Sequence, residues 1–462
     1  MRTSRPAALA ACLTLTAAIF TATLPSNAAV PDPAAAPDPT RASQSVARPQ
    51  PAAASQPAAS QRVASQRVAA SQPVAASQPV AASQPVAASQ PVAASQPVAV
   101  SQPVAGSSNV RAEGGRIILG DAPAAIGSTE IYQRSGLAEL TPVHFAGLTS
   151  AVVVGYSAAI PNGMSASVDV RSWAAGRWSE WTEAKSGAPT ALPSASDQVQ
   201  LRVIITAPPT GGSPSVADLT VQPTDKVAAP RMSVQAAPLK SHVFATREGL
   251  VGGTTANGHV IVSRDHFVAL PSRRGLSGNG SGTYSVKVCT ASRCAFEPVW
   301  DVGPWNTKDD YWNPSATREM WKDLPQGKPE AQAAYQDGYN GGKDQFGRTV
   351  ANPAGIDLAD GVFWDALKLA DNSFVDVTYL WTGDGGRGTV SISSGYLNVR
   401  NAPNSTGAVV GMAGKSAQVT VECQTTGETV TGSQGTTNIW LRVNTGMYVA
   451  KAWISAGTFG TC

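Results

Sequence analysis

Apolar and polar residues alternate along much of the chain after residue 106, with the two-residue period of β-strands. In the first part of this region, runs rich in β-branched and apolar residues are separated by clusters of Gly, Pro, Asn and Ser; the runs cover residues 117–119, 151–154, 166–171 and 199–205. Short strands at this spacing are typical of a β-sandwich. The pattern predicts a sandwich over residues 107–225, with no helix of useful length in it.

The β pattern returns after a proline-containing stretch at residues 226–241, which we interpret as a linker. Residues 242–384 contain further strand-like runs, interrupted by a segment at residues 306–354 with a helical stretch that ends at Gly338. A last set of short alternating runs occupies residues 389–462. The chain is therefore predicted to be mainly β and multidomain.

Residues 29–106 contain almost no large apolar or aromatic side chains and repeat the hexapeptide Ala-Ala-Ser-Gln-Pro-Val. Such a composition cannot bury enough surface to offset the entropy of ordering. Regular prolines favour an extended polyproline conformation. We predict a disordered low-complexity tether, which serves either as a spacer through a porous wall or as a solvated leader.

The first 28 residues have the pattern of a secretory signal. Arg2 and Arg5 precede an apolar stretch at residues 7–24, and Ser26-Asn27-Ala28 supplies the small residues that signal peptidase requires. A lipobox ending at Cys12 is the alternative, but it would leave almost no apolar core before the cysteine. The pattern predicts a protein that is secreted, extracellular or associated with the cell wall.

Charge and composition exclude several classes of partner. Removing Arg2 and Arg5 with the signal lowers the formal charge from +3 to +1, and 14% of residues are charged. A near-neutral chain has no electrostatic footprint for nucleic acid or an anionic membrane. No later apolar run approaches spanning length, and the four histidines make no zinc pattern with the cysteines. We expect a monomer with no cofactor, no metal and no membrane association after cleavage.

Four cysteines remain after the signal, an even number that indicates two disulfides in an exported protein. Cys289 and Cys294 flank a loop short enough to bring two strand ends together. Cys423 and Cys462 would then attach the end of the chain to the last domain.

Three tryptophans in nine residues, Trp173, Trp178 and Trp181, mark the predicted sandwich. This segment resembles jelly-roll accessory modules of exported wall hydrolases. The tryptophans form either a platform that stacks on sugars or a hairpin packed on its own sandwich, and we favour packing.

Motifs in residues 242–384 resemble those of the double-psi β-barrel group, which contains the rare lipoprotein A lytic transglycosylases and the expansins. The motifs are Thr255-Ala256-Asn257-Gly258, Leu270-Pro271, Asp301-Val302-Gly303-Pro304 and Ile356-Asp357-Leu358-Ala359, in the order found in that group. The resemblance implies a double-psi β-barrel whose acid is Asp301. It also implies that one acid/base suffices for a lytic transglycosylase, because the muramyl sugar's own 6-hydroxyl is the nucleophile.

The residues around Asp301 suit acid catalysis. A carboxyl partly desolvated by indole rings has a raised pKa, which favours donation of a proton to a glycosidic oxygen. The tryptophans that would bind sugar faces are Trp300, Trp305 and Trp312. Asp357 is either a second catalytic carboxylate or the N-cap of a short helix at residues 358–367, and we favour capping. Catalysis also requires an open cleft at Asp301.

Three departures from the group's pattern weaken the catalytic hypothesis. Val302 stands where the group has arginine, and His259 where it has an acidic residue. The group's histidine falls on Phe267, with the candidate His266 one residue away, and a shift of one residue turns a strand side chain to the other face. The insert at residues 306–354 is also unusual, and it either walls a groove or pads the barrel.

Residues 389–462 resemble a bacterial SH3 module. The signature is Leu397-Asn398-Val399-Arg400 followed by Pro403. The resemblance implies binding of peptidoglycan peptides, with Tyr396 and Tyr448 as candidate contacts. Trp440 and Trp453 are either further contacts or core residues.

Two functional hypotheses follow. The first is a secreted wall-active enzyme, a lytic transglycosylase or glycoside hydrolase with Asp301 as general acid, targeted to peptidoglycan or another wall polysaccharide by the SH3 module. The alternative is a non-catalytic barrel, either expansin-like and wall-binding or inhibitor-like and directed at a protease.

Overall fold

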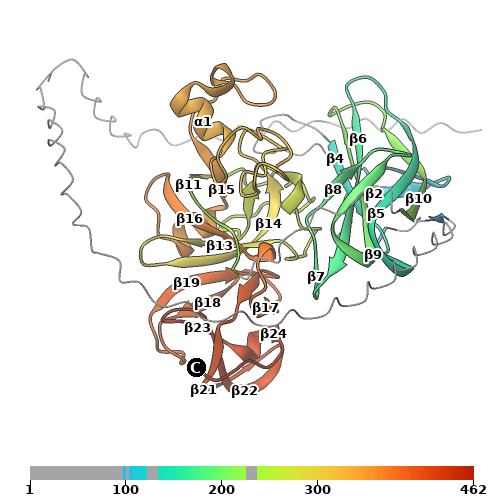
Figure 1. Ribbon diagram of the computed structural model, residues 1–462. Helices are drawn as coiled ribbons and strands as arrows, with labels where there is room; N and C mark the ends of the chain where they lie inside the picture. The colour runs from blue at the N-terminus through green and yellow to red at the C-terminus, as the bar shows by residue number, and fades with distance from the viewer. Residues whose placement is uncertain (1–96, 100–102, 122–133, 225–236) are drawn as a thin grey trace, which may run out of the picture. The chain divides into compact units, whose positions relative to one another are not determined.

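A computed structural model describes residues 97–99, 103–121, 134–224 and 237–462, and strands dominate these residues (Figure 1). The expectation of a mainly β chain is confirmed. The predicted signal at residues 1–28, its lipobox alternative and the tether up to residue 96 lie outside the described residues. Within the described residues, no helix is long and apolar enough to cross a membrane.

The first β region forms one ten-stranded sheet in the order β2-β3-β10-β5-β9-β6-β7, with β1 on β10, β4 on β9 and β8 on β6. Its strands are β1 (Val98–Ala99), β2 (Val110–Glu113), β3 (Arg116–Leu119), β4 (Arg134–Glu139), β5 (Val143–Ala159), β6 (Ser165–Ala174), β7 (Arg177–Trp178), β8 (Thr182–Ala184), β9 (Pro189–Ala207) and β10 (Ser215–Thr224). Alternate residues of β5 and β9 turn inward and form a core with Val168 and Val170 of β6. We refer to the described residues in 97–224 as the sandwich region, after the fold predicted from the sequence. Their strands form one continuous sheet, and a two-sheet sandwich stays a prediction.

This region begins inside the range predicted as tether. Val98 pairs with Val221, and the backbone of Ser108 exchanges two hydrogen bonds with that of Leu137. Part of the hexapeptide segment therefore forms a strand, because a short segment without a core of its own can be held by backbone pairing to a formed strand.

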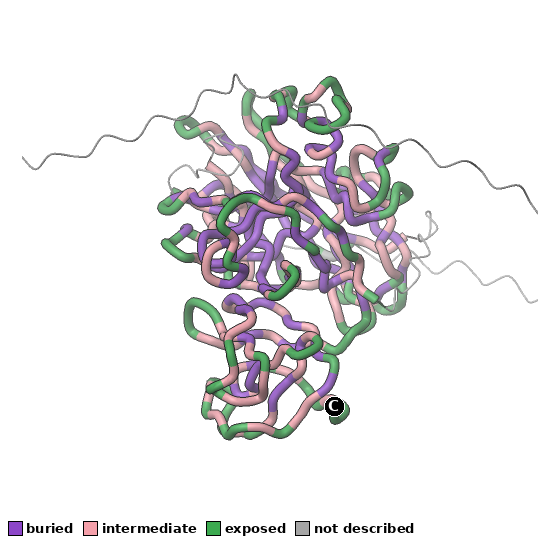
Figure 2. Tube along the Cα trace, turned by 90° about the vertical axis from the view of Figure 1, so that its left-hand side faces the viewer, coloured by how far each residue is buried: buried purple, intermediate pink, exposed green. Residues whose placement is uncertain are grey.

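The second β region is a closed barrel of six strands in the order β12-β15-β11-β16-β13-β14, closed by pairing of β12 with β14. The strands are β11 (Lys240–Arg247), β12 (Val268–Leu270), β13 (Ser285–Cys289), β14 (Cys294–Val302), β15 (Ala354–Leu358) and β16 (Ser373–Tyr379). Pairs β11–β15 and β12–β14 are parallel, and the others are antiparallel. Buried residues fill the interior (Figure 2).

The connections of the barrel contain the short helices. These are the 3-10 turns η1 (Arg273–Gly275), η2 (Tyr339–Gly342) and η4 (Leu380–Thr382), the α-helix α1 (Glu330–Asp337) and the π-helix η3 (Gly361–Ala366). The helix predicted in the insert is confirmed as α1, which ends at Gly338 with a φ of 69°. Tyr311 and Trp312 of the insert are buried in the barrel core, so this part of the insert pads the barrel.

The last region continues the barrel sheet, because β19 pairs in parallel with β14. Its strands are β17 (Arg387–Val390), β18 (Tyr396–Arg400), β19 (Val409–Gly414), β20 (Gln418–Thr420), β21 (Cys423–Gly432), β22 (Gly435–Asn444), β23 (Met447–Ala450) and β24 (Ile454–Ala456), with the 3-10 turn η5 (Lys451–Trp453). Strands β20, β17 and β24 form a separate three-stranded sheet. Both expected disulfides are confirmed, Cys289–Cys294 and Cys423–Cys462.

Candidate active site: a buried carboxyl cluster

Asp301 lies near the end of β14, and its carboxyl is fixed on one side by the backbone. Oδ1 accepts hydrogen bonds from the N–H groups of Ala256 and Val302, at 2.7 and 2.8 Å. The residue is 2% exposed. No amide or hydroxyl group of the described residues donates to Oδ2. Burial raises the pKa of Asp301, although the hydrogen bonds it accepts oppose this rise.

Glu248, which directly follows β11, interacts with Asp301. The oxygens of Glu248 are also buried and receive no amide or hydroxyl hydrogen bond from the described residues. The two carboxyls instead share a hydrogen bond with each other. Burial, and then the negative charge of Asp301, raise the pKa of Glu248 well above its usual range. A negative charge on one carboxyl disfavours ionisation of the other, so the protonated form of Glu248 is favoured.

Glu248 is the member of the site that sequence reasoning missed. The motif comparison looked for an acidic residue after the Asn-Gly turn and found His259 there. The available signal was an acidic residue at the exit of a strand and directly before Gly249. Only the parallel pairing of β11 with β15 brings that strand exit to the same end of the barrel as Asp357.

Asp357 lies within β15, and its side chain accepts a hydrogen bond from the hydroxyl of Thr246. Burial raises the pKa of Asp357 to about 7. The favoured capping role is wrong, because the N-cap of η3 is Asp360, three residues later. Asp357 belongs to the carboxyl cluster instead, and the charge of Asp301 is a further cause of its raised pKa.

His266 lies apart from Asp301. Its Nδ1 is 3.0 Å from Oε1 of Glu297, and its ring packs on Tyr396 of β18 with centroids 4.7 Å apart. Burial lowers the pKa of His266, but the charges of Glu297 and other carboxylates raise it by more. The net shift of this pKa is therefore upward. His266 therefore forms a buried pair at the junction of the barrel with the last region.

Apolar residues of both regions pack against the turn and the strand end beside Asp301. Leu137 and Ile204 of the sandwich region pack with Leu276 and Val302 of the barrel, beside Ala256. Asp301 is 2% exposed, so its carboxyl does not face the open cleft that catalysis requires in this conformation.

A short segment before β2 adds to these contacts. The hydroxyl of Ser108 donates to the carbonyl of Asn257 at 2.6 Å, and the N–H of Asn279 donates to the carbonyl of Gly106. Gly258 has a φ of 86°, and a Cβ there would lie 2.3 Å from Oγ of Ser108. The Thr-Ala-Asn-Gly turn thus needs glycine both for its conformation and for this close approach.

The three tryptophans expected to bind sugar are partly or wholly covered. Trp300 is 5% exposed and donates its indole N–H to Ser281, while Trp312 is 1% exposed. Trp305 is half-buried and donates to Asn352. Of the three, Trp305 alone offers part of its ring to solvent in this structure.

The three tryptophans of the sandwich region also differ in how far they are buried. Trp181 is 1% exposed and lies between the guanidinium groups of Arg171 and Arg202, whose carbons are 4.1 and 4.5 Å from its rings. It belongs to the barrel core cluster, so it joins the two regions. Trp173 is 37% exposed and packs edge-on against Trp178. Trp181 is therefore buried, but against the barrel core and not, as favoured from the sequence, in a hairpin packed on its own sandwich.

In the last region, Tyr396 is 44% exposed and Tyr448 is half-buried. Trp440 is 3% exposed and donates its indole N–H to the carbonyl of Glu428, so it is a core residue. Trp453 is half-buried. Among the described residues, no group of His, Cys, Asp and Glu side chains is arranged to hold a metal ion.

Comparisons with known proteins add one result. No curated protein and no solved structure matches the chain. A family model described as a domain of unknown function (DUF8814) matches residues 239–378. The matched range begins one residue before β11 and ends one residue before the end of β16, so it coincides with the barrel and its insert.

Proposed function

We propose that this chain is a secreted, wall-associated protein whose barrel is of the double-psi type and cleaves glycan, with the last region acting as an SH3-like targeting module. The closed six-stranded barrel with two parallel pairs supports this proposal, as does the order of its motifs. The exposed Tyr396 is available for a targeting contact.

The observation that carries the catalytic proposal is the buried pair of carboxyls Asp301 and Glu248, which have unpaired oxygens and raised pKa values. Burying carboxyls without cationic partners is costly. A strongly shifted pair of this kind is typical of acid/base sites. Glu248 also supplies a second carboxyl, which the motif comparison lacked at His259.

The pair can perform the reaction of a lytic transglycosylase without another co-reactant. It donates its proton to the glycosidic oxygen as the bond from that oxygen to C1 breaks. The 6-hydroxyl oxygen of the same sugar then bonds to C1, and the hydroxyl proton returns to the pair. Asp301 is the general acid in this scheme, and Glu248 holds the shared proton in position.

A polysaccharide reaches the pair only when the covering residues move. From the side of the sandwich region, Leu137 and Ile204 pack with Val302, and Ser108 donates to Asn257. We infer that these residues close the site. The described conformation is therefore the closed form of the proposed enzyme. Its activity depends on opening, which an extended wall substrate can promote by binding the open form preferentially.

A second candidate, non-catalytic wall binding, is favoured by the 2% exposure of Asp301. In this case the carboxyl pair stays closed and stabilises the Thr-Ala-Asn-Gly turn through Ala256. The protein would then bind the cell wall without cleaving its glycan.

The test uses the secreted full-length chain on purified insoluble peptidoglycan, with soluble fragments identified by mass spectrometry and retained protein measured by sedimentation. The enzyme proposal expects anhydro-sugar fragments from the wild type, lost in Asp301→Asn and Glu248→Gln and unchanged in the exposed control Asp371→Asn. Retention on the wall without any released fragment would support the binding candidate. A chain that neither stays on the wall nor releases fragments would refute both candidates.

A further inference from the structure

A second polar site lies between the sandwich region and the barrel, away from the carboxyl cluster. It is a cavity of about 210 Å³. Its lining comprises Ser165, Ala166, Ser167, Asp169, Trp181, Glu183 and Arg202 from the sandwich region, and Arg273, Arg274, Thr307, Lys308 and Glu319 from the barrel. Cavities for drug-sized ligands are typically about 300–1,000 Å³, so this one fits a smaller ligand.

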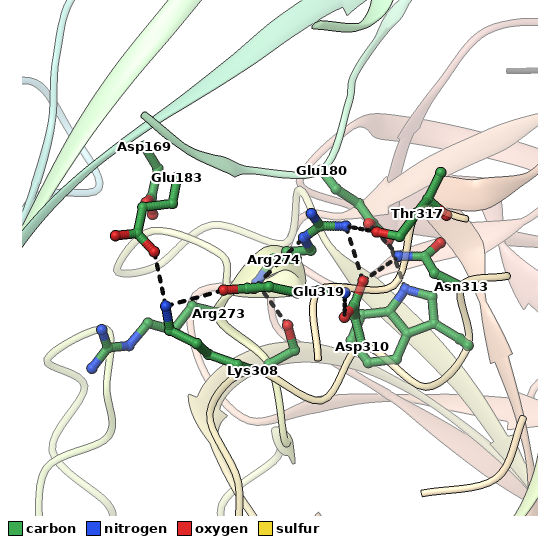
Figure 3. Close-up of polar contacts among 12 residues, drawn as sticks. Asp169, Glu180, Glu183, Arg273, Arg274, Lys308, Asp310, Asn313, Thr317 and Glu319 are labelled. Atoms are coloured by element: carbon green, nitrogen blue, oxygen red, sulfur yellow. Dashed lines mark hydrogen bonds and ion pairs between the residues drawn. The ribbon is translucent and has the colours of Figure 1, made fainter. Parts of the chain in front are cut away.

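Most of the lining charges are already paired. Nε of Arg202 is 2.7 Å from Asp169, and Lys308 contacts Glu183 and Glu319 at 2.8 and 3.2 Å. Arg274 is paired with Asp310, just outside the cavity, at 2.9 Å (Figure 3). These pairs fix the walls of the cavity and leave little free charge on them.

Arg273 is the exception. Its side chain makes no hydrogen bond and no ion pair with any described residue, and Figure 3 draws none from its guanidinium. Burial lowers the pKa of Arg273. The charges of Asp169, Glu183 and Glu319 oppose this effect, and that of Arg202 adds to it. Buried or half-buried arginines normally pair with a carboxylate, and the half-buried Arg273 makes no such pair.

Two further polar atoms on the lining residues have no partner among the described residues. They are Nε1 of Trp181 and Oγ of Ser167, and both are buried. An indole N–H can only donate, and a guanidinium likewise offers only donors. The unpaired donors would therefore bind a hydrogen-bond acceptor. A carboxylate or phosphate is a stronger acceptor than a neutral hydroxyl.

We propose that this cavity binds a small oxyanion, a carboxylate or phosphate group on a unit of about one sugar or amino acid, with Arg273 as its main ligand. Trp181 and Ser167 contribute further hydrogen bonds. Because the lining comes from both regions, the bound anion also stabilises their docking. This site is independent of the proposed glycan cleavage, since none of Glu248, Asp301 and Asp357 lines it.

The test is calorimetric titration of the secreted full-length chain at low ionic strength with D-glucuronate, D-glucose 6-phosphate and D-glucose. We expect saturable binding of at least one anionic sugar at one site per chain, and none of glucose. Binding of glucuronate alone identifies a carboxylate site, and binding of glucose 6-phosphate alone identifies a phosphate site. Equal binding of glucose, or no saturable binding of either anion, overturns the proposal.

Variants separate specific binding from general attraction. Arg273→Gln should weaken binding roughly tenfold to a hundredfold, the loss expected for a hydrogen bond to a charged group. Trp181→Phe keeps the ring between the two arginines and should weaken binding a few-fold. The exposed Lys368→Gln is the control and should leave binding unchanged. Wild-type affinity in Arg273→Gln, or an equal loss in Lys368→Gln, refutes the proposal.

Folding of the main variant is measured in parallel. Arg273→Gln removes an unpaired, half-buried charge and no observed hydrogen bond of the side chain. Its thermal midpoint without ligand should therefore equal or exceed that of the wild type. Ligand should raise the midpoint of the wild type but not that of the variant. A variant midpoint that rises as much with ligand as that of the wild type contradicts the role of Arg273.

Discussion

Asp301 and Asp357 lie in one row across the barrel, one on each side of Ala269. Ala269 of β12 pairs with Asp301 of β14 and with Asp357 of β15, and Asp357 in turn pairs with Thr246 of β11. Neighbours in such a row direct their side chains to the same face. The small side chain of Ala269 leaves space between the two aspartates, whose backbones are roughly 10 Å apart at two strand spacings.

The raised pKa of Asp357 predicts a particular pH dependence of stability. The folded pKa of about 7 lies above the ordinary value of 3.8, so the folded state binds more protons between these values. Stability from this group is therefore full below about pH 4 and is lost as pH rises toward about 7. Urea unfolding from pH 4.5 to 8 should show a shallower decline in Asp357→Asn than in the wild type. The exposed Asp371→Asn should keep the wild-type slope, and identical slopes in all three proteins would contradict this role of Asp357.

Glu180 should contribute strongly to stability at the docking of the sandwich region on the barrel. Its carboxylate accepts the indole N–H groups of Trp312 and Trp381 at 2.7 and 2.8 Å, and an amide N–H of Asn313 at 2.7 Å. Glu180→Ala leaves two largely buried indole donors unpaired, at a cost of about 1–3 kcal/mol each.

The measurement for Glu180→Ala is the free energy of unfolding in urea. The matched control is Glu422→Gln, which breaks a pair with Arg442 whose side chains are 38% and 36% exposed. We expect the control to lose less than about 1 kcal/mol. Similar losses in both variants would show that Glu180 is no more than a surface contact.

The two disulfides should stabilise the chain unequally. Cys423–Cys462 closes a separation of 39 residues, and Cys289–Cys294 a separation of 5. Loop-closure entropy gives about 4 kcal/mol for the longer loop and about 2 kcal/mol for the shorter one. Paired substitution by alanine, followed by urea unfolding, should therefore cost more at Cys423 and Cys462. The reverse order would mean that native-state effects outweigh chain entropy here.

Gly258→Ala tests whether the segment around Ser108 limits access to the carboxyl pair. The added Cβ would lie within 2.3 Å of Ser108 Oγ, so the segment must move away from the turn. Hydrogen exchange at residues 103–109 should become faster, and glycan release should rise above that of the wild type.

A glycine with the same backbone strain but no neighbour provides the control for Gly258→Ala. Gly176 has a φ of 76° and open space around its Cβ position. Gly176→Ala should leave exchange at residues 103–109 and glycan release unchanged. Faster exchange in Gly258→Ala without more release would mean that other residues, such as Leu137 and Ile204, close the site.

The sequence by itself determined the features that depend on local chemistry. Alternating patterns gave the mainly β class, and Gly338 marked the end of α1 because glycine adopts a positive φ at little cost. The even number of cysteines, with two of them close in sequence, predicted both disulfides. Each of these follows from a few neighbouring residues or from composition.

Only the tertiary structure decided which residues form the site and what covers it. The row through Asp301, Ala269 and Asp357 depends on the parallel pairing of β12 with β14. The pairing of β11 with β15 brings Glu248 to the same end of the barrel. Leu137 and Ile204 were ordinary apolar residues of a predicted sandwich until docking placed them over the barrel. Strand pairing and docking depend on the packing free energy of the whole fold, which local patterns do not contain.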